Sequence, residues 1–217
     1  TAAQLESLRA LDRRGDDLDT GAQALLERVD GDRSRLLGGR LQVAGGWETA
    51  VEEVLAERLH ALVAGEGEWR DALAWMRGRE AGRFPAVRPG NGQAGGAGSG
   101  GLMAKLECDA ELAPILAEWL AGVGAADDLD DALARAGELA PGELLVTPDG
   151  DRVGRDWVVV HRGADDPETS WLQRKREIEA LEERLAAEDA RIEAAEVALE
   201  TAREAFETAR ERVETAR

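Results

Sequence analysis

The last fifty residues of the chain repeat with a seven-residue period that is typical of a long, paired helix. Every seventh position is apolar, and the position three residues after it is mostly alanine. The first set is Ile178, Leu185, Ile192, Leu199, Phe206 and Val213, and the second is Leu181, Glu188, Ala195, Ala202, Ala209 and Ala216. Heptads that stay in phase this long predict a coiled-coil helix over residues 168–217, whose apolar seam needs a second helix.

A short helix near the start of the chain can supply part of that cover. Residues 1–13 carry Leu5, Leu8 and Leu11 among polar neighbours, and Gly15 follows. A helix of this length spans roughly 20 Å, so it reaches along the seam only to about Leu185. We expect the two helices to pair antiparallel. The seam positions then left facing water would be Ile192, Leu199, Phe206 and Val213.

Short strand and helix patterns fill the middle of the chain, which predicts a mixed α+β block. The predicted organisation is a coiled-coil stub with short connecting helices at 1–40, a first subdomain at 41–89, a linker at 90–101, a second subdomain at 102–163, and the arm at 168–217. The linker has seven glycines in twelve residues. Its match to G-x-G-x-x-G at Gly96, Gly98 and Gly101 lacks the preceding strand of a dinucleotide site, so we interpret it as linker.

Composition excludes several classes of function. The net charge of -18 argues against strong DNA binding by the whole surface. Cys108 is the single cysteine, which excludes an internal disulfide and a Cys-x-x-Cys zinc site and fits a reducing cytosol. We find no signal peptide, and we expect Thr1 to be an artificial boundary. No Walker A motif is present, so this chain is not predicted to be an enzyme, and no catalytic residue, metal or cofactor is predicted.

Two clusters of charge have competing interpretations. Asp127, Asp128, Asp130 and Asp131 look like calcium ligands, but the EF-hand glycine and final glutamate are missing, so helix capping explains them better. The basic run of Arg174, Lys175 and Arg176 opens the last helix. These three either pair with nearby glutamates or contact phosphate groups of DNA.

Two stretches of the block resemble the hinge domain of bacterial SMC (structural maintenance of chromosomes) proteins. Residues 45–52 (GGWETAVE), followed by Val54 and Leu55, resemble the opening of that domain. Residues 144–151 (LLVTPDGD) resemble its closing strand and turn. The glycine-rich separator and the segment from Gly101 through Leu133 also fit, so the resemblance covers residues 41–163 between two arms. Leu102, Met103 and Ala104 stand where the family usually has paired glycines.

The resemblance implies a fold and a role. The fold is a two-subdomain block inserted between antiparallel coiled-coil arms. Such hinges join two SMC chains in a dimer, and the whole complex, a condensin, condenses and segregates the chromosome in the cytoplasm, at the nucleoid. ATPase heads at the far ends of the arms are not part of this chain. Family hinges also touch DNA near the coils, which favours the phosphate interpretation of Arg174, Lys175 and Arg176.

The dimer contact is predicted at a strand over residues 101–108. An exposed edge strand offers unpaired N–H and C=O groups to a partner. The predicted contact residues are Gly101, Leu102, Met103, Ala104 and Lys105. The alternative interpretation of the chain is a small-molecule-binding α/β domain with a helical oligomerisation tail, which need not be a dimer. A zinc-hook repair ATPase is a third possibility, which the missing Cys-x-x-Cys argues against.

Overall fold

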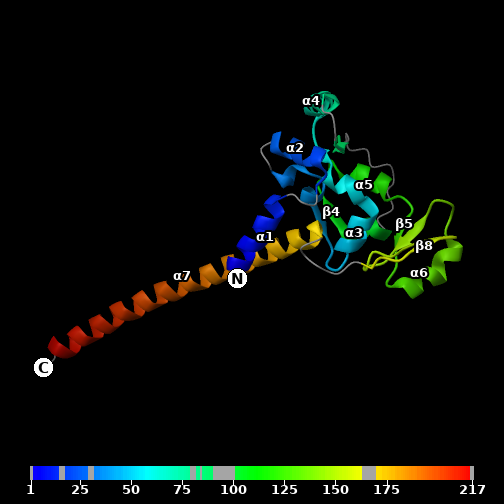
Figure 1. The fold of residues 1–217 in the computed structure, drawn as a ribbon. Coiled ribbons are helices and arrows are strands. Elements are labelled where there is room, and N and C mark those ends of the chain that lie inside the picture. The colour runs from blue at the N-terminus through cyan, green and yellow to red at the C-terminus, as the bar shows by residue number, and fades with distance from the viewer. Residues whose placement is uncertain are drawn as a thin grey trace. The chain divides into compact units, whose positions relative to one another are not determined.

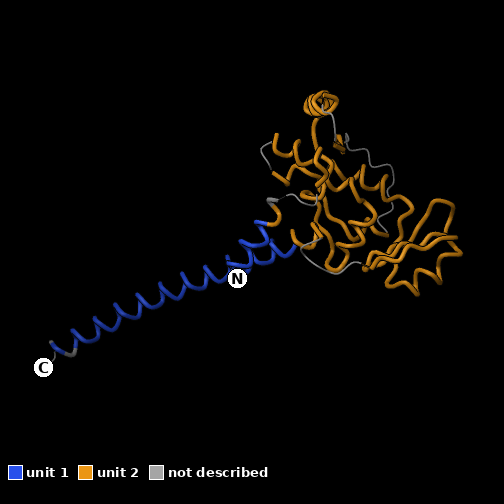
Figure 2. The backbone as a smooth tube through the Cα atoms, viewed as in Figure 1, with its two compact units in different colours: residues 1–10, 176–217 blue, residues 11–175 orange. Residues whose placement is uncertain are grey.

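The chain folds into helices and small sheets, which confirms the predicted α+β class (Figure 1). The computed structural model describes residues 2–14, 18–28, 32–78, 82–83, 85–89, 101–162 and 170–215. The predicted linker lies outside these residues except for Gly101. The chain divides into two compact units, one of residues 1–10 with 176–217 and one of residues 11–175 (Figure 2).

The elements follow one another in mixed order. The helices are α1 (Ala2–Arg14), α2 (Thr20–Arg28), α3 (Glu48–Leu55), α4 (Glu66–Arg77), α5 (Ala113–Trp119), α6 (Leu129–Arg135) and α7 (Trp171–Thr215). The strands are β1 (Leu41–Val43), β2 (Leu62–Val63), β3 (Ala86–Val87), β4 (Leu106–Cys108), β5 (Val123–Ala125), β6 (Leu144–Val146), β7 (Arg152–Gly154) and β8 (Val158–Val159). Short 3-10 turns connect them, among them η3 (Ala56–His60) and η4 (Gly101–Lys105). None of the described helices is long and apolar enough to cross a membrane.

The first unit consists of most of α1 beside the 45-residue helix α7 from residue 176 onward, and the two run antiparallel as predicted (Figure 1). Gln4 donates a hydrogen bond to Glu177, and Arg9 forms an ion pair with Glu182. Leu5 and Leu8 are buried. The early seam residues Ile178, Leu181 and Leu185 are half-buried.

Beyond Leu185 the seam of α7 is open to water. Ile192, Leu199 and Phe206 are each more than half exposed, as the sequence predicted, while the side chain of Val213 lies outside the described residues. The short first helix therefore covers only the start of the seam. The remaining apolar positions keep the spacing that a partner helix needs.

The second unit contains three small sheets. β1 pairs antiparallel with β4, with Leu41 opposite Cys108, and β2 pairs parallel with β3. The third sheet has the order β5-β6-β7-β8, with a parallel β5–β6 pair and antiparallel pairs after it. The pairing of β4 with β1 joins segments from the two sides of the predicted linker. The subdomain boundary at residues 90–101 therefore stays a prediction.

A large hydrophobic core holds the second unit together. It contains side chains from α2, β1, α3 and α5, and it includes Trp171 and Leu172 from the first turn of α7. Ala50, Val51 and Leu55 of α3 lie on one helical face and are fully buried in it. A smaller cluster of Ala126, Ala132, Leu145 and Val153 lies between α6 and the four-stranded sheet. The core therefore extends well outside residues 41–163.

The aspartate run at the start of α6 caps the helix, as predicted. The carboxylate of Asp128 accepts a hydrogen bond from the backbone N–H of Asp131 at 2.8 Å. Asp131 accepts hydrogen bonds from Arg135 and from the N–H of Asp127, and these bonds lower the pKa of its carboxyl. Charged acceptors here satisfy N–H groups that the first turn leaves unpaired.

Candidate dimerisation edge and helix junction

The four-stranded sheet ends at β8, and no further described strand covers that edge. β8 pairs with β7, so that Val159 lies opposite Arg152 and Val158 opposite Val153. The residues that we call the β8 edge, Trp157, Val158, Val159 and Val160, are each between 40% and 47% exposed. Because successive side chains point to opposite faces of a strand, four apolar neighbours leave apolar surface on both faces. Such an edge can accept another strand.

Trp157 gives the β8 edge a fixed shape at one end. The backbone N–H of Gly154 donates to the carbonyl of Trp157, and a methyl group at Gly154 would collide with the indole ring. The tryptophan also lines a shallow cavity of about 340 Å³ with Ala140, Pro141, Gly142, Glu143, Arg155 and Asp156. A large apolar side chain beside a hollow is a common anchor in protein interfaces.

The opposite edge of this sheet, at β5, is covered by η4. Gly101 has a positive φ of 67°, and a Cβ atom there would collide with the carbonyl of Val123. Leu102 is fully buried in the large core, and Met103 packs against it. Lys105 places its ammonium 4.7 Å from the centre of the Trp47 ring, and Ala104 is exposed.

The prediction of one continuous strand over residues 101–108 was therefore wrong. Only Leu106–Cys108 is a strand, and it pairs on one side with β1 in a two-stranded sheet. The glycine conformation and the burial of Leu102 turn residues 101–105 into 3-10 geometry instead. Their predicted place in a dimer contact stays a prediction, carried mainly by the exposed Ala104.

The start of α7 is built into the second unit, and we call residues 170–175 the α7 root. Trp171 is only 4% exposed, and Leu172 is buried beside it. The Trp171 ring meets His60 edge-on at 5.4 Å, and the guanidinium of Arg33 lies 5.0 Å from the ring centre. A methyl group at Gly38 would collide with the indole, so glycine makes room for it.

Helix α3 supplies the polar contacts that hold the first turn of α7. The carboxylate of Glu52 accepts hydrogen bonds from the Ser170 hydroxyl at 3.0 Å and from the backbone N–H of Leu172 at 2.7 Å. Ser170 in turn accepts from the N–H of Gln173, whose side chain donates to Thr49. These acceptors satisfy N–H groups of the helix start, where negative charge is also favourable.

The three predicted DNA-contact residues have different surroundings. Arg174 is only 2% exposed, and its Nε lies 3.6 Å from the carboxylate of Asp12. Lys175 donates to the backbone carbonyls of Leu41 at 2.6 Å and Gly38 at 3.4 Å. Arg176 is exposed. A phosphate would therefore compete with contacts that Arg174 and Lys175 already make inside the chain.

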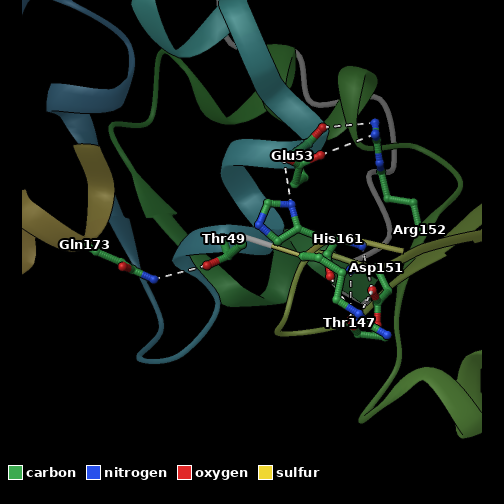
Figure 3. A network of polar contacts seen from close by, with 8 residues as sticks. Thr49, Glu53, Thr147, Asp151, Arg152, His161 and Gln173 are labelled. Carbon is green, nitrogen blue, oxygen red and sulfur yellow. Dashed lines mark hydrogen bonds and ion pairs between the residues drawn. The ribbon is translucent and has the colours of Figure 1, made fainter. Parts of the chain in front are cut away.

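A polar network joins the sheet to α3 (Figure 3). Glu53 forms an ion pair with Arg152 of β7 at 3.3 Å, and its carboxylate also lies 3.3 Å from Nδ1 of His161, just after β8. The backbone N–H of His161 donates to the buried carboxylate of Asp151 at 2.8 Å. Asp151 also closes the turn after β6, because its N–H and carbonyl bond to Thr147. The N–H of Gly150 donates to the carbonyl of Thr147 and so forms a β-turn, where the resemblance placed the closing turn.

Comparisons with known proteins identify the family of this chain. Residues 32–136 match the family model of the SMC proteins flexible hinge domain. The chain carries an SMC hinge domain. It is 32% identical over 192 residues to the chromosome partition protein Smc of Delftia acidovorans and 33% identical over 187 residues to that of Methylococcus capsulatus. These alignments cover 86% and 82% of this chain but only 16% of each relative, so the chain spans about one sixth of their length.

Solved hinge structures share the fold. The asymmetric dimer of the Geobacillus stearothermophilus SMC hinge domain matches with a TM-score of 0.68 at 23% identity, covering 87% of this chain and 82% of that one. The folded elbow of cohesin matches with a TM-score of 0.53 at 13% identity, covering 85% of this chain and 29% of that one. At these identities the likeness supports the fold and nothing further.

Sequence reasoning missed the exposed edge of the hinge. The sequence pattern at residues 157–160 predicts an ordinary returning strand. The available signal was the lack of alternation, since four consecutive apolar residues in an antiparallel strand have no solvent-facing polar side chain. The anchoring role of Trp171 was also missed, because it precedes the heptad pattern and belongs to a different unit from most of α7.

Proposed function

We propose that this hinge joins two copies of the chain through the β8 edge. The observation that carries the proposal is the row of four exposed apolar residues from Trp157 to Val160 at an uncovered sheet edge. A second copy offers the same edge, so a two-fold contact can satisfy both. The Geobacillus stearothermophilus hinge, which is described as an asymmetric dimer, motivates a dimer here but does not identify the contact surface.

The proposed role of the whole protein is chromosome condensation and segregation. Its support is the likeness to chromosome partition proteins named Smc. The role is structural at the hinge, where two arms meet, and ATPase activity would belong to head domains that this chain does not contain. The proposal places the protein in the cytoplasm, at the nucleoid.

Molar mass as a function of concentration tests the dimer. Light scattering on residues 1–217 at two concentrations at least a hundredfold apart should show a shift from one chain to two. A block cut to residues 41–163 is unsuitable, because it lacks Leu36, Leu37 and Trp171 of the large core. One chain mass at every concentration would refute the proposal.

Removing the open part of the seam should leave this dimer intact. Burying Ile192, Leu199 or Phe206 is worth about 1.5–3 kcal/mol each, so their exposure favours pairing of overhanging arms between molecules. A chain ending at Leu185 should therefore lose any assembly larger than a dimer and keep the melting temperature of its block. Persistence of larger assemblies would implicate another surface. Loss of the dimer would show that the arms held it together.

We also propose weak, non-specific DNA contact near the start of α7, with Arg176 as the main residue. At most two of the three cations can reach a phosphate if Arg174 stays buried, which gives a log–log salt slope of roughly -1 to -2. Arg176→Glu should abolish binding in a fluorescence-anisotropy titration. Arg203→Glu, an exposed change on the same helix, is the matched control and should leave binding nearly unchanged. Equal affinity of both variants would refute the assignment.

A further inference from the structure

Two neighbouring residues of α3 hold two different parts of the hinge. Glu52 binds the α7 root, while Glu53 binds the β7–β8 side of the sheet. Adjacent residues of a helix point about 100° apart, so one short helix can reach both partners. Figure 3 shows the same division, with Thr49 meeting Gln173 on one side and Glu53 meeting Arg152 and His161 on the other.

On the sheet side, the contacts run directly from the β8 edge to α3. Val159 pairs with Arg152 across the β7–β8 ladder. The side chain of Arg152 donates to the backbone carbonyl of Glu53 and lies 3.3 Å from its carboxylate. His161, two residues after Val159, makes the second contact with Glu53. A β8 strand of only two residues depends on its neighbours for order, so adding a partner strand would also fix His161.

Helix α3 can transmit a displacement because it is anchored along its length. Ala50, Val51 and Leu55 are buried in the large core, so the eight-residue helix moves as one piece. A shift that separates Glu53 from Arg152 therefore also moves Glu52 relative to the N–H of Leu172. Packed elements of this kind carry coupling between distant sites.

We propose that α3 couples the β8 edge to the α7 root, so that strand pairing at β8 and the seating of the first turn of α7 favour each other. The inference rests on the proposed dimer for the identity of the partner strand. Coupling of this kind is reciprocal, so a well-seated α7 also tightens the dimer. Dimerisation of the hinge would then change the seating of the first turn of α7 through Glu53 and Glu52.

Hydrogen exchange at the Leu172 amide measures the seating of α7, because this N–H donates to Glu52. In the full chain, raising the concentration through the dimer transition should slow that exchange at least about fivefold. Glu53→Gln keeps the size of the side chain but removes its charge, and exchange should then no longer respond to dimerisation. Glu57→Gln, whose ion pair with Arg83 is exposed, is the matched control and should behave like the parent chain.

Two outcomes would overturn the coupling. One is a parent chain that dimerises with no change at Leu172, and the other is a Glu53→Gln dimer with the full response. Arg152→Gln removes the same contact from the sheet side, so Leu172 exchange in this variant should also stop responding to dimerisation. Agreement between the two variants excludes a folding defect in one of them as the cause.

If the chain never dimerises, the proposed function is refuted. The coupling can still be tested in the monomer. His161→Ala should speed Leu172 exchange about fivefold in the parent chain and less than twofold in the Glu53→Gln background. An equal effect of His161→Ala in both backgrounds would refute the coupling.

Discussion

Val159→Lys should convert the dimer to a monomer while leaving the fold intact. The side chain is 44% exposed in the single chain, so a lysine there is tolerated by the monomer. In the dimer both copies would place a charge at the apolar contact, where charges are costly to bury. We expect the dissociation constant to rise at least about 100-fold, or about 2.7 kcal/mol, in sedimentation equilibrium.

Val197→Lys is the matched control for this prediction. Val197 is also an exposed valine, but it lies on α7 outside the seam and belongs to the other compact unit. The control should leave the dissociation constant within about threefold of the parent value. Equal weakening by both substitutions would show that net charge, and not the β8 edge, governs association.

Trp171→Ala should cause the largest loss of stability of any single change considered. The side chain is almost fully buried against Gly38, His60 and Arg33, and truncating a buried tryptophan typically costs about 3–5 kcal/mol. Chemical denaturation gives the free energy of unfolding. Measuring it in the Val159→Lys background removes any contribution from dimerisation, since assembly stabilises the folded state by mass action.

Trp157→Ala is the control that separates the two tryptophans. Because Trp157 is 45% exposed, Trp157→Ala should lower the free energy of unfolding by less than half as much as Trp171→Ala does. It should instead weaken the dimer, since it removes apolar area from the β8 edge. If Trp171→Ala proved as mild as Trp157→Ala, the α7 root would not be part of the folding core.

Features that repeat locally could be predicted from the sequence. The long helix, its antiparallel short partner and the exposed seam beyond Leu185 followed from heptad spacing and helix length alone. The cap at Asp128 and the turn at Thr147 followed from the hydrogen bonds that these side chains and the backbone form with near neighbours. The resemblance at residues 45–52 and 144–151 led to the correct family.

Features that depend on distant partners were decided only by the tertiary structure. Residues 101–105 carry a strand-like sequence, but burial of Leu102 and the close approach of Gly101 to Val123 fold them against β5 instead. The basic run at residues 174–176 looks like a surface patch in the sequence, but the fold buries the side chain of Arg174. Likewise, Glu52 and Glu53 are two ordinary helix glutamates until the fold brings the α7 root to one and β7 to the other. At these positions long-range packing decides which side chains meet water, and local spacing did not predict it.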